Sequence, residues 1–95
     1  LRENKYGEKN FDDVLYSWFL RLSVADEPGV LAEIAGTLGE NSVSIESVIQ
    51  EGRGDKAELV LITHEAPEKA LETSLMQLTA LSSVSKITST LRVYS

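Results

Sequence analysis

The sequence predicts a ferredoxin-like α+β sandwich, a four-stranded antiparallel sheet in βαββαβ order with two helices on one face. Three observations indicate it. Strand-like and helix-like periods alternate twice along the chain, a proline stands at the start of each helix-like segment, and a glycine-rich turn joins the two halves. Because such crossovers are right-handed, both helices should cover the same face, with the first and third strands in the middle.

The first half begins with a strand expected over residues 17–24, where apolar and polar side chains alternate with a period of two. Pro28 then fits the first turn of a helix, where a missing N–H group costs nothing. Asp26 or Glu27 is expected to cap or charge this helix start. Apolar residues follow at helical spacing as far as Gly39, a residue type that often ends helices.

The first half ends with a strand expected over residues 43–50, and the two glycines within residues 51–55 indicate the hairpin turn that leads into the second half. The third strand, residues 57–64, is apolar on both faces, which indicates a central and covered position. Pro67 should start the second helix, which continues with leucines at helical spacing.

Apolar side chains are also expected on the sheet face that the helices leave bare. The residues expected there are Phe19, Val48, Val60 and Ile62. The last strand should carry Ile87, Leu91 and Val93 on one face and Thr88, Thr90 and Arg92 on the other. Small domains tolerate scattered exposed apolar residues, but four on neighbouring strands favour a partner surface, most simply a second copy of the chain.

Length and charge narrow the class of protein. The 95 residues suit one domain: residues 17–95 form it, and residues 1–16, without a sustained period, are expected to be a linker or the tail of a preceding catalytic domain. The net charge of −6 disfavours nucleic acid and anionic membrane surfaces as partners. The absence of cysteine fits a reducing, cytoplasmic compartment.

The residues that most enzyme sites need are missing. With one histidine and no cysteine, a Cys–His pair is excluded, and no nucleophile motif accompanies His64, which is expected to satisfy a chain end or helix start. No zinc or calcium spacing occurs, so no metal site is expected. The glycines of residues 52–55 lack a phosphate-binding lysine. The chain alone is therefore not expected to be an enzyme or to hold a cofactor.

The joint at residues 26–29, "DEPG", offers chemistry of another kind. The first N–H groups of a helix have no partner within it and attract a carboxylate, and Gly29 lets a ligand approach the backbone closely. Asp26 stands beside them and could accept a hydrogen bond from an ammonium group. The joint suits a free amino acid, although the same residues also serve as a plain helix start.

Residues 17–94 resemble the ACT domain, the small-molecule-sensing module of amino-acid metabolism. The first half carries "LRLSVADEPGVLAEIAGTLGENSVSIESVIQ", in which a strand, "DEPGVL", a helix and "VSI" follow one another. The second half carries "AELVLITHEAPEKAL" and a closing "LRVY". These stretches, "ITHEA" above all, are similar to the C-terminal ACT domain of homoserine dehydrogenase.

The resemblance implies a ligand held between the first loop of one copy and the second strand of its neighbour. The residues implied are Asp26, Glu27, Gly29, Val30 and Leu31 from the loop and Ser42, Val43, Ser44 and Ile45 from the strand. Where several relatives have a glycine before this strand, the chain has Asn41 and Ser42.

The resemblance also implies a parent enzyme that reduces aspartate semialdehyde to homoserine with NADPH or NADH on other domains. Threonine, the end product, would then be the favoured effector of a homodimeric or larger regulatory domain. Two alternatives stay open: an oligomerisation module without a ligand, and the ACT domain of another enzyme of amino-acid biosynthesis.

Overall fold

The computed structural model describes residues 14–53 and 56–93, with the exception of the side chain of Arg53. The elements are β1 (Leu15–Ala25), α1 (Val30–Glu40), β2 (Ile45–Arg53), β3 (Lys56–Thr63), β4 (Ala66–Pro67), α2 (Glu68–Thr79) and β5 (Val84–Val93). The predicted βαββαβ order is confirmed, with the two-residue strand β4 added before α2.

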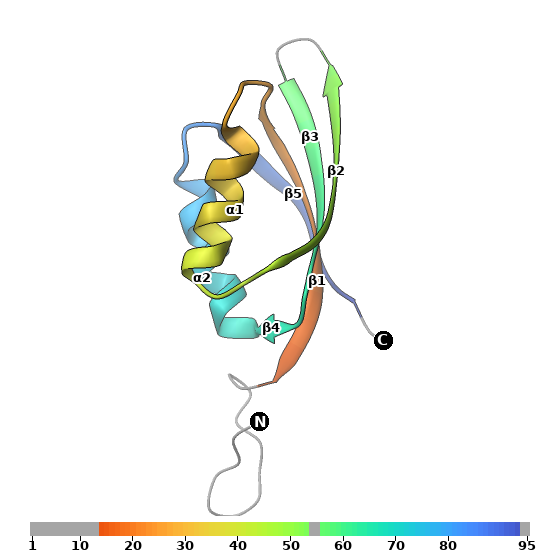
Figure 1. The fold of residues 1–95 in the computed structure, drawn as a ribbon, viewed down its shortest axis with the longest axis vertical. Helices are drawn as coiled ribbons and strands as arrows, with labels where there is room; N and C mark the ends of the chain where they lie inside the picture. The colour runs from red at the N-terminus through yellow and green to blue at the C-terminus, as the bar shows by residue number, and fades with distance from the viewer. Residues whose placement is uncertain (1–13, 54–55, 94–95) are drawn as a thin grey trace, which may run out of the picture.

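The sheet is antiparallel, with β3 and β1 in the middle and β2 and β5 at the edges. Both helices cover the same face, as predicted (Figure 1). The short strand β4 continues along β1 beyond the end of β3, where it pairs with Leu15 and Tyr16. β1 therefore begins two residues inside the segment that was expected to be a linker, while residues 1–13 lie outside the described part of the chain.

The core lies between the sheet and the helices. Alternate side chains of the two central strands point into it, because strand residues two apart share a face, and the apolar stripes of both helices close it. Its fully buried large side chains are Leu20, Leu22, Leu59, Leu61, Ile34, Leu38, Leu71 and Leu78. This packing anchors β1 and β3, and the candidate site lies at the end of β1, between the loop that leads into α1 and the strand β2.

The bare sheet face differs from the prediction on β2. Val48 lies opposite Leu61, which is fully buried, so Val48 is on the helix-covered side of the sheet although 39% of it is exposed. Ile49, which lies opposite Val60, is on the bare face where Val48 was expected. The cause is a shift in strand register between Ile45 and Ser47, since an extra residue reverses the direction of every side chain after it.

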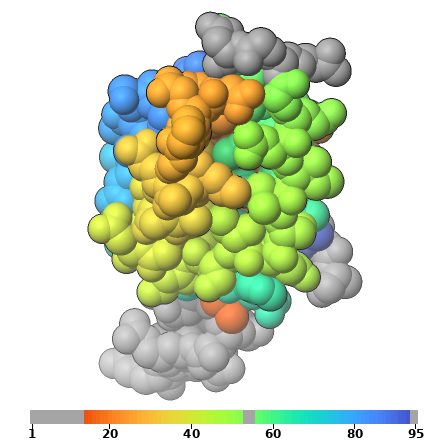
Figure 2. All heavy atoms as spheres, turned by 45° about the horizontal axis from the view of Figure 1, so that its top comes forward, coloured from red at the N-terminus to blue at the C-terminus, as the bar shows by residue number. Residues whose placement is uncertain are grey.

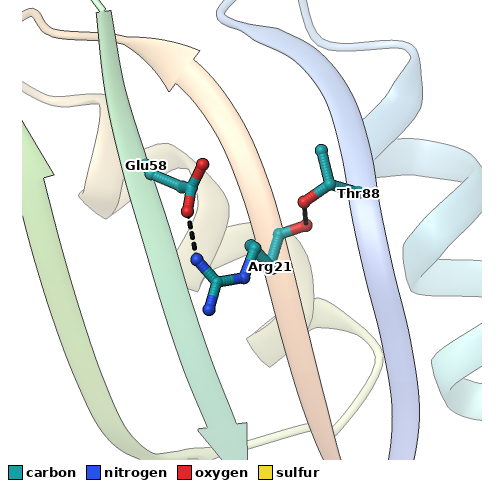
Figure 3. A network of polar contacts seen from close by, with 3 residues as sticks. All are labelled: Arg21, Glu58 and Thr88. Carbon is teal, nitrogen blue, oxygen red and sulfur yellow. Dashed lines mark hydrogen bonds and ion pairs between the residues drawn. The ribbon is translucent and has the colours of Figure 1, made fainter. Parts of the chain in front are cut away.

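The prediction for β5 was also wrong in one place. Ile87 pairs with Leu22 on the core side, whereas Leu91 pairs with Phe19 on the bare face. The register shifts between these pairs, and Thr88 is the extra residue. Figure 3 shows Thr88 beside β1, where its hydroxyl donates to the carbonyl oxygen of Arg21 at 3.1 Å, while the Arg21 guanidinium pairs with Glu58.

The chain after α1 turns through a left-handed residue. Ser42 has φ +62°, and the N–H groups of Ser42 and Val43 donate to the carbonyls of Gly39 and Leu38, each at 2.9 Å. Glycine is the usual residue at such a helix end, since a Cβ is strained there. The helix continues one residue past the expected stop at Gly39.

Boundaries elsewhere move by a few residues. β2 begins at Ile45 and runs to Arg53, so only residues 54–55, outside the described part of the chain, remain for the expected hairpin turn. Among the described residues, no helix is long and apolar enough to cross a membrane.

Candidate functional site

A cavity of about 350 Å³ lies between the β1–α1 loop and the edge strand β2. Its lining residues are Val24, Ala25, Asp26, Glu27, Pro28, Gly29, Val30, Leu31, Gln50 and Leu59. Figure 2 shows the hollow between the orange start of α1 and the green strand β2. Its volume lies at the lower end of the range of about 300–1,000 Å³ that ligand pockets occupy, which suits a small ligand.

The wall on the helix side is made by backbone. Gly29 precedes the helix with φ +87°, a conformation that glycine adopts without strain, and this turns the chain sharply into α1. The N–H group of Glu33 donates to the carbonyl of Gly29 at 2.9 Å, which closes the first helical turn. The N–H groups that precede Glu33 lie at the positive end of the helix dipole and suit an anion.

The helix start differs from the prediction in two respects. α1 begins at Val30, so Pro28 lies in the turn before the helix rather than in its first turn. Asp26 or Glu27 was expected to cap or charge the helix start, and neither forms a side-chain cap hydrogen bond. The amide end of α1 is consequently left uncovered by protein carboxylates at the cavity wall.

Asp26 instead faces the opposite wall. Its Oδ1 lies 3.5 Å from Nε2 of Gln50 on β2, and its Oδ2 lies close to the backbone of Gly52. The cavity therefore has a negative pole at Asp26 and a positive pole at the start of α1. Such a pair of poles matches the ammonium and carboxylate groups of a free amino acid.

The floor and one side of the cavity are apolar. Val24 of β1 and Leu59 of β3 are each 1% exposed and form part of the core, while Leu31 is half-buried at the helix wall. An apolar floor with a few polar groups at its rim is typical of small-molecule sites. The floor can take the carbon side chain of a ligand whose charged groups lie at the rim.

The structure brings the five loop residues of the predicted site together: Asp26, Glu27, Gly29, Val30 and Leu31 all line the cavity. It does not bring Ser42, Val43, Ser44 and Ile45 to the same cavity of the chain. These follow the far end of α1, whose 11 residues span about 16 Å. The side chain of Val43 packs in the core, while Ser44 is exposed. Their contribution to a neighbour's site stays a prediction.

Sequence reasoning missed Gln50. The alternation from residue 43 places it on the face away from the helices, and the register shift near the start of β2 turns it toward the cavity. No signal in the sequence marks that shift. Among the described residues, no group of three acidic, histidine or cysteine side chains could hold a metal ion.

The fold and the cavity define a small α+β module with a pocket at a strand-to-helix joint. The family model of the ACT domain matches residues 18–83, and the chain belongs to this family. ACT domains are regulatory modules that bind small amino-acid ligands and often oligomerise.

Within the ACT family, the chain is similar to domains of homoserine dehydrogenases. The chain is 38% identical over 86 residues to homoserine dehydrogenase of Neisseria gonorrhoeae, a match that covers 88% of this chain and 20% of that protein. A crystal structure of homoserine dehydrogenase from Thiobacillus denitrificans superposes with a TM-score of 0.77 at 29% identity, covering 90% of this chain and 19% of that one. The predicted resemblance to homoserine dehydrogenase is confirmed, and the chain spans about a fifth of these relatives' length.

The ACT domain of the GTP pyrophosphokinase of Chlorobium tepidum shares the fold, with a TM-score of 0.63 at 14% identity. That match covers 84% of this chain and the whole of the other chain.

Proposed function

We propose that this chain is the amino-acid-sensing domain of a homoserine dehydrogenase and that threonine is its favoured effector. The observation that carries the proposal is the cavity at the β1–α1 joint, which is lined both by a helix start without a side-chain cap and by Asp26, whose carboxylate lies near Gln50 of β2. The similarity to homoserine dehydrogenases supports an effector from the pathway in which homoserine is made, and threonine is the end product of that pathway. Binding of the end product would inhibit the attached enzyme.

The binding mode follows from the two poles. The ligand carboxylate would accept hydrogen bonds from the first N–H groups of α1, and its ammonium would donate to Asp26. The methyl group of threonine would lie against the apolar floor at Leu59. Gln50 both donates and accepts hydrogen bonds, so its amide suits the threonine hydroxyl.

A second copy of the chain would complete the assembly. The bare sheet face carries exposed apolar side chains, Ile49 and Leu91 among them, which support a homodimer or larger homo-oligomer. The approach of Ser44 and Ile45 of one copy to the loop of its neighbour stays a prediction from the resemblance. NADP or NAD and the substrate of the parent enzyme would bind outside these 95 residues. The cytoplasmic location stays a prediction.

A thermal-melt screen of the 95-residue chain tests the proposal. Threonine at a hundredfold excess over its Kd should stabilise the fold by about 2.7 kcal/mol, which raises Tm by more than roughly 10 °C for a domain of this size. Serine, isoleucine, valine, leucine and methionine are the competitors. Threonine methyl ester lacks the carboxylate charge and N-acetylthreonine lacks the ammonium, so each should raise Tm by less than threonine does at the same concentration. A dimeric sample that melts unchanged with every amino acid at millimolar concentration would rule out the sensing role.

A second candidate function, an oligomerisation module without a ligand, is supported by the same apolar sheet face. It predicts a dimer in sedimentation experiments and no melt shift with any amino acid. A further alternative is the ACT domain of another amino-acid biosynthetic enzyme, in which case the screen would select an effector other than threonine.

A further inference from the structure

Gly52 lies on the edge strand β2 beside the cavity, and its missing side chain makes room for a carboxylate. It pairs with Ala57, which pairs in turn with the buried Val24, so this row of the sheet faces the helices. A Cβ atom at Gly52 would lie 2.8 Å from Oδ2 and 3.6 Å from Cγ of Asp26. Real Cβ atoms do not approach an oxygen so closely, so any side chain at this position displaces the Asp26 carboxylate.

Backbone conformation does not explain this glycine. Among the described residues the glycine with positive φ is Gly29, so Gly52 has a backbone that other residues also adopt. A glycine inside a strand weakens the strand and often marks a close approach of another group. Here the group that approaches is the carboxylate of Asp26.

A second contact holds the same carboxylate. Gln50 precedes Gly52 by two residues on the same face of β2, and its Nε2 lies 3.5 Å from Oδ1 of Asp26. Both carboxylate oxygens therefore face β2, one toward the Gln50 amide and one toward the Gly52 backbone. The loop that begins α1 is thereby tied across the cavity to the edge strand.

We propose that Gly52 is a positioning residue that seats the Asp26 carboxylate on β2 and so sets the separation of the two poles of the cavity. The inference rests on the proposed function, because it concerns how the same cavity selects an amino acid. An α-amino acid carries both charges on one carbon atom, so its two contacts must lie at a fixed separation. A displaced carboxylate would contact the ammonium poorly while the helix start still held the ligand carboxylate.

The decisive variant is Gly52→Ala, with Gly36→Ala and Gly39→Ala in α1 as matched controls, since a Cβ at either control position meets no atom within 4 Å. Titration calorimetry with threonine should show about tenfold weaker binding for Gly52→Ala, as expected when one charged hydrogen bond at a partly exposed site is lost. Both controls should keep the affinity of the unchanged chain. The melting temperature of Gly52→Ala should change little, because the displaced oxygens end a flexible, exposed side chain.

A double-mutant cycle separates this role from a general effect of the methyl group. Asp26→Ala should weaken threonine binding by itself, and Gly52→Ala should add no further loss in that background, because no carboxylate remains to be displaced. If Gly52→Ala weakened threonine binding equally in the unchanged chain and in the Asp26→Ala variant, the proposal would be overturned.

The side-chain amide signal of Gln50 in an NMR spectrum gives a readout without ligand. In Gly52→Ala this signal should move to the position that it has in Asp26→Ala, and in the two controls it should stay in place. An unmoved signal in Gly52→Ala overturns the positioning role, whatever the binding data show. If the unchanged chain binds no amino acid, the proposed function fails, and the Gln50 signal still decides whether Gly52 positions Asp26.

Discussion

The hydroxyl of Thr88 donates a hydrogen bond to the carbonyl oxygen of Arg21, 3.1 Å away, at the point where β5 carries one residue more than β1 opposite it. An extra residue in a strand interrupts the ladder of backbone hydrogen bonds. The Thr88 hydroxyl supplies a side-chain hydrogen bond between the two strands at this interruption. This bond stabilises the bulge that places Ile87 on the core side of the sheet and Leu91 on the bare face.

The first prediction concerns this bond. Thr88→Val keeps the branched shape and removes the donor, so the free energy of unfolding should fall by about 0.5–1 kcal/mol, which lowers Tm by roughly 2–8 °C. Thr88→Ser retains the hydroxyl and should keep most of the stability. Thermal melts followed by circular dichroism check both variants; equal melting temperatures for the valine and serine variants would contradict the role of the hydroxyl.

The left-handed residue after α1 gives the second prediction. Ser42→Gly removes the strain of a Cβ at φ +62° and should raise the free energy of unfolding by about 0.5–1 kcal/mol, or Tm by roughly 2–8 °C. Ser44→Gly is the matched control, because Ser44 has no positive φ and glycine there only adds freedom to the unfolded chain. The control should melt at a lower temperature than the unchanged chain. A fall in Tm for Ser42→Gly would show that the added freedom of the unfolded chain outweighs the relief of strain at this turn.

The third prediction tests the negative pole of the cavity. Asp26→Asn keeps the shape of the side chain but removes its charge, so threonine should bind about tenfold more weakly, and the remaining affinity should come from the start of α1. Glu65→Gln removes a charge from an exposed acid that does not line the cavity and should leave the Kd unchanged. Titration calorimetry measures both. Equal threonine affinities in the two variants would show that Asp26 does not bind the ligand ammonium.

The fourth prediction concerns the bare sheet face. Leu91 is 59% exposed on this face, and Leu91→Lys should weaken self-association because two lysines would meet across a dimer contact. Met76→Lys is the control: Met76 is 74% exposed on α2, on the side of the sheet that the helices cover. Sedimentation velocity at tens of micromolar should show monomer for the first variant and dimer for the second. If both variants sediment alike, the sheet face is not the contact.

The order of strands and helices could be predicted from the sequence because the buried side chains of each segment recur at a regular spacing. Period-two alternation in β1 and helical spacing in α1 persist over 11 residues each, and the core side chains follow those periods. The loop half of the candidate site was predictable for the same reason. A strand end and a helix start fix the place of the joint between them, and Gly29 marks it.

The misplaced residues share one physical cause. Val48, Gln50 and Ile87 each lie beyond a register shift, and a single extra residue moves a side chain to the other face of the sheet. Whether a strand contains such a shift depends on how its neighbour twists and pairs, which a single sequence does not encode locally. The seating of Asp26 against Gly52 was unpredictable for a related reason, since it depends on contact between the first loop and an edge strand.

β1 runs from the point where the preceding chain enters the domain to the candidate ligand cavity. The cavity lies at its last residues, and the chain that precedes the domain enters at Leu15, about 33 Å away for a strand of 11 residues. β4, β5 and β3 between them pair with every residue of β1, and the six central residues have a partner on both sides, so backbone hydrogen bonds hold the strand to the sheet along its length. A shift of the loop around a ligand would therefore act on a strand that the sheet holds along its length, as far as the point where the preceding chain enters the domain.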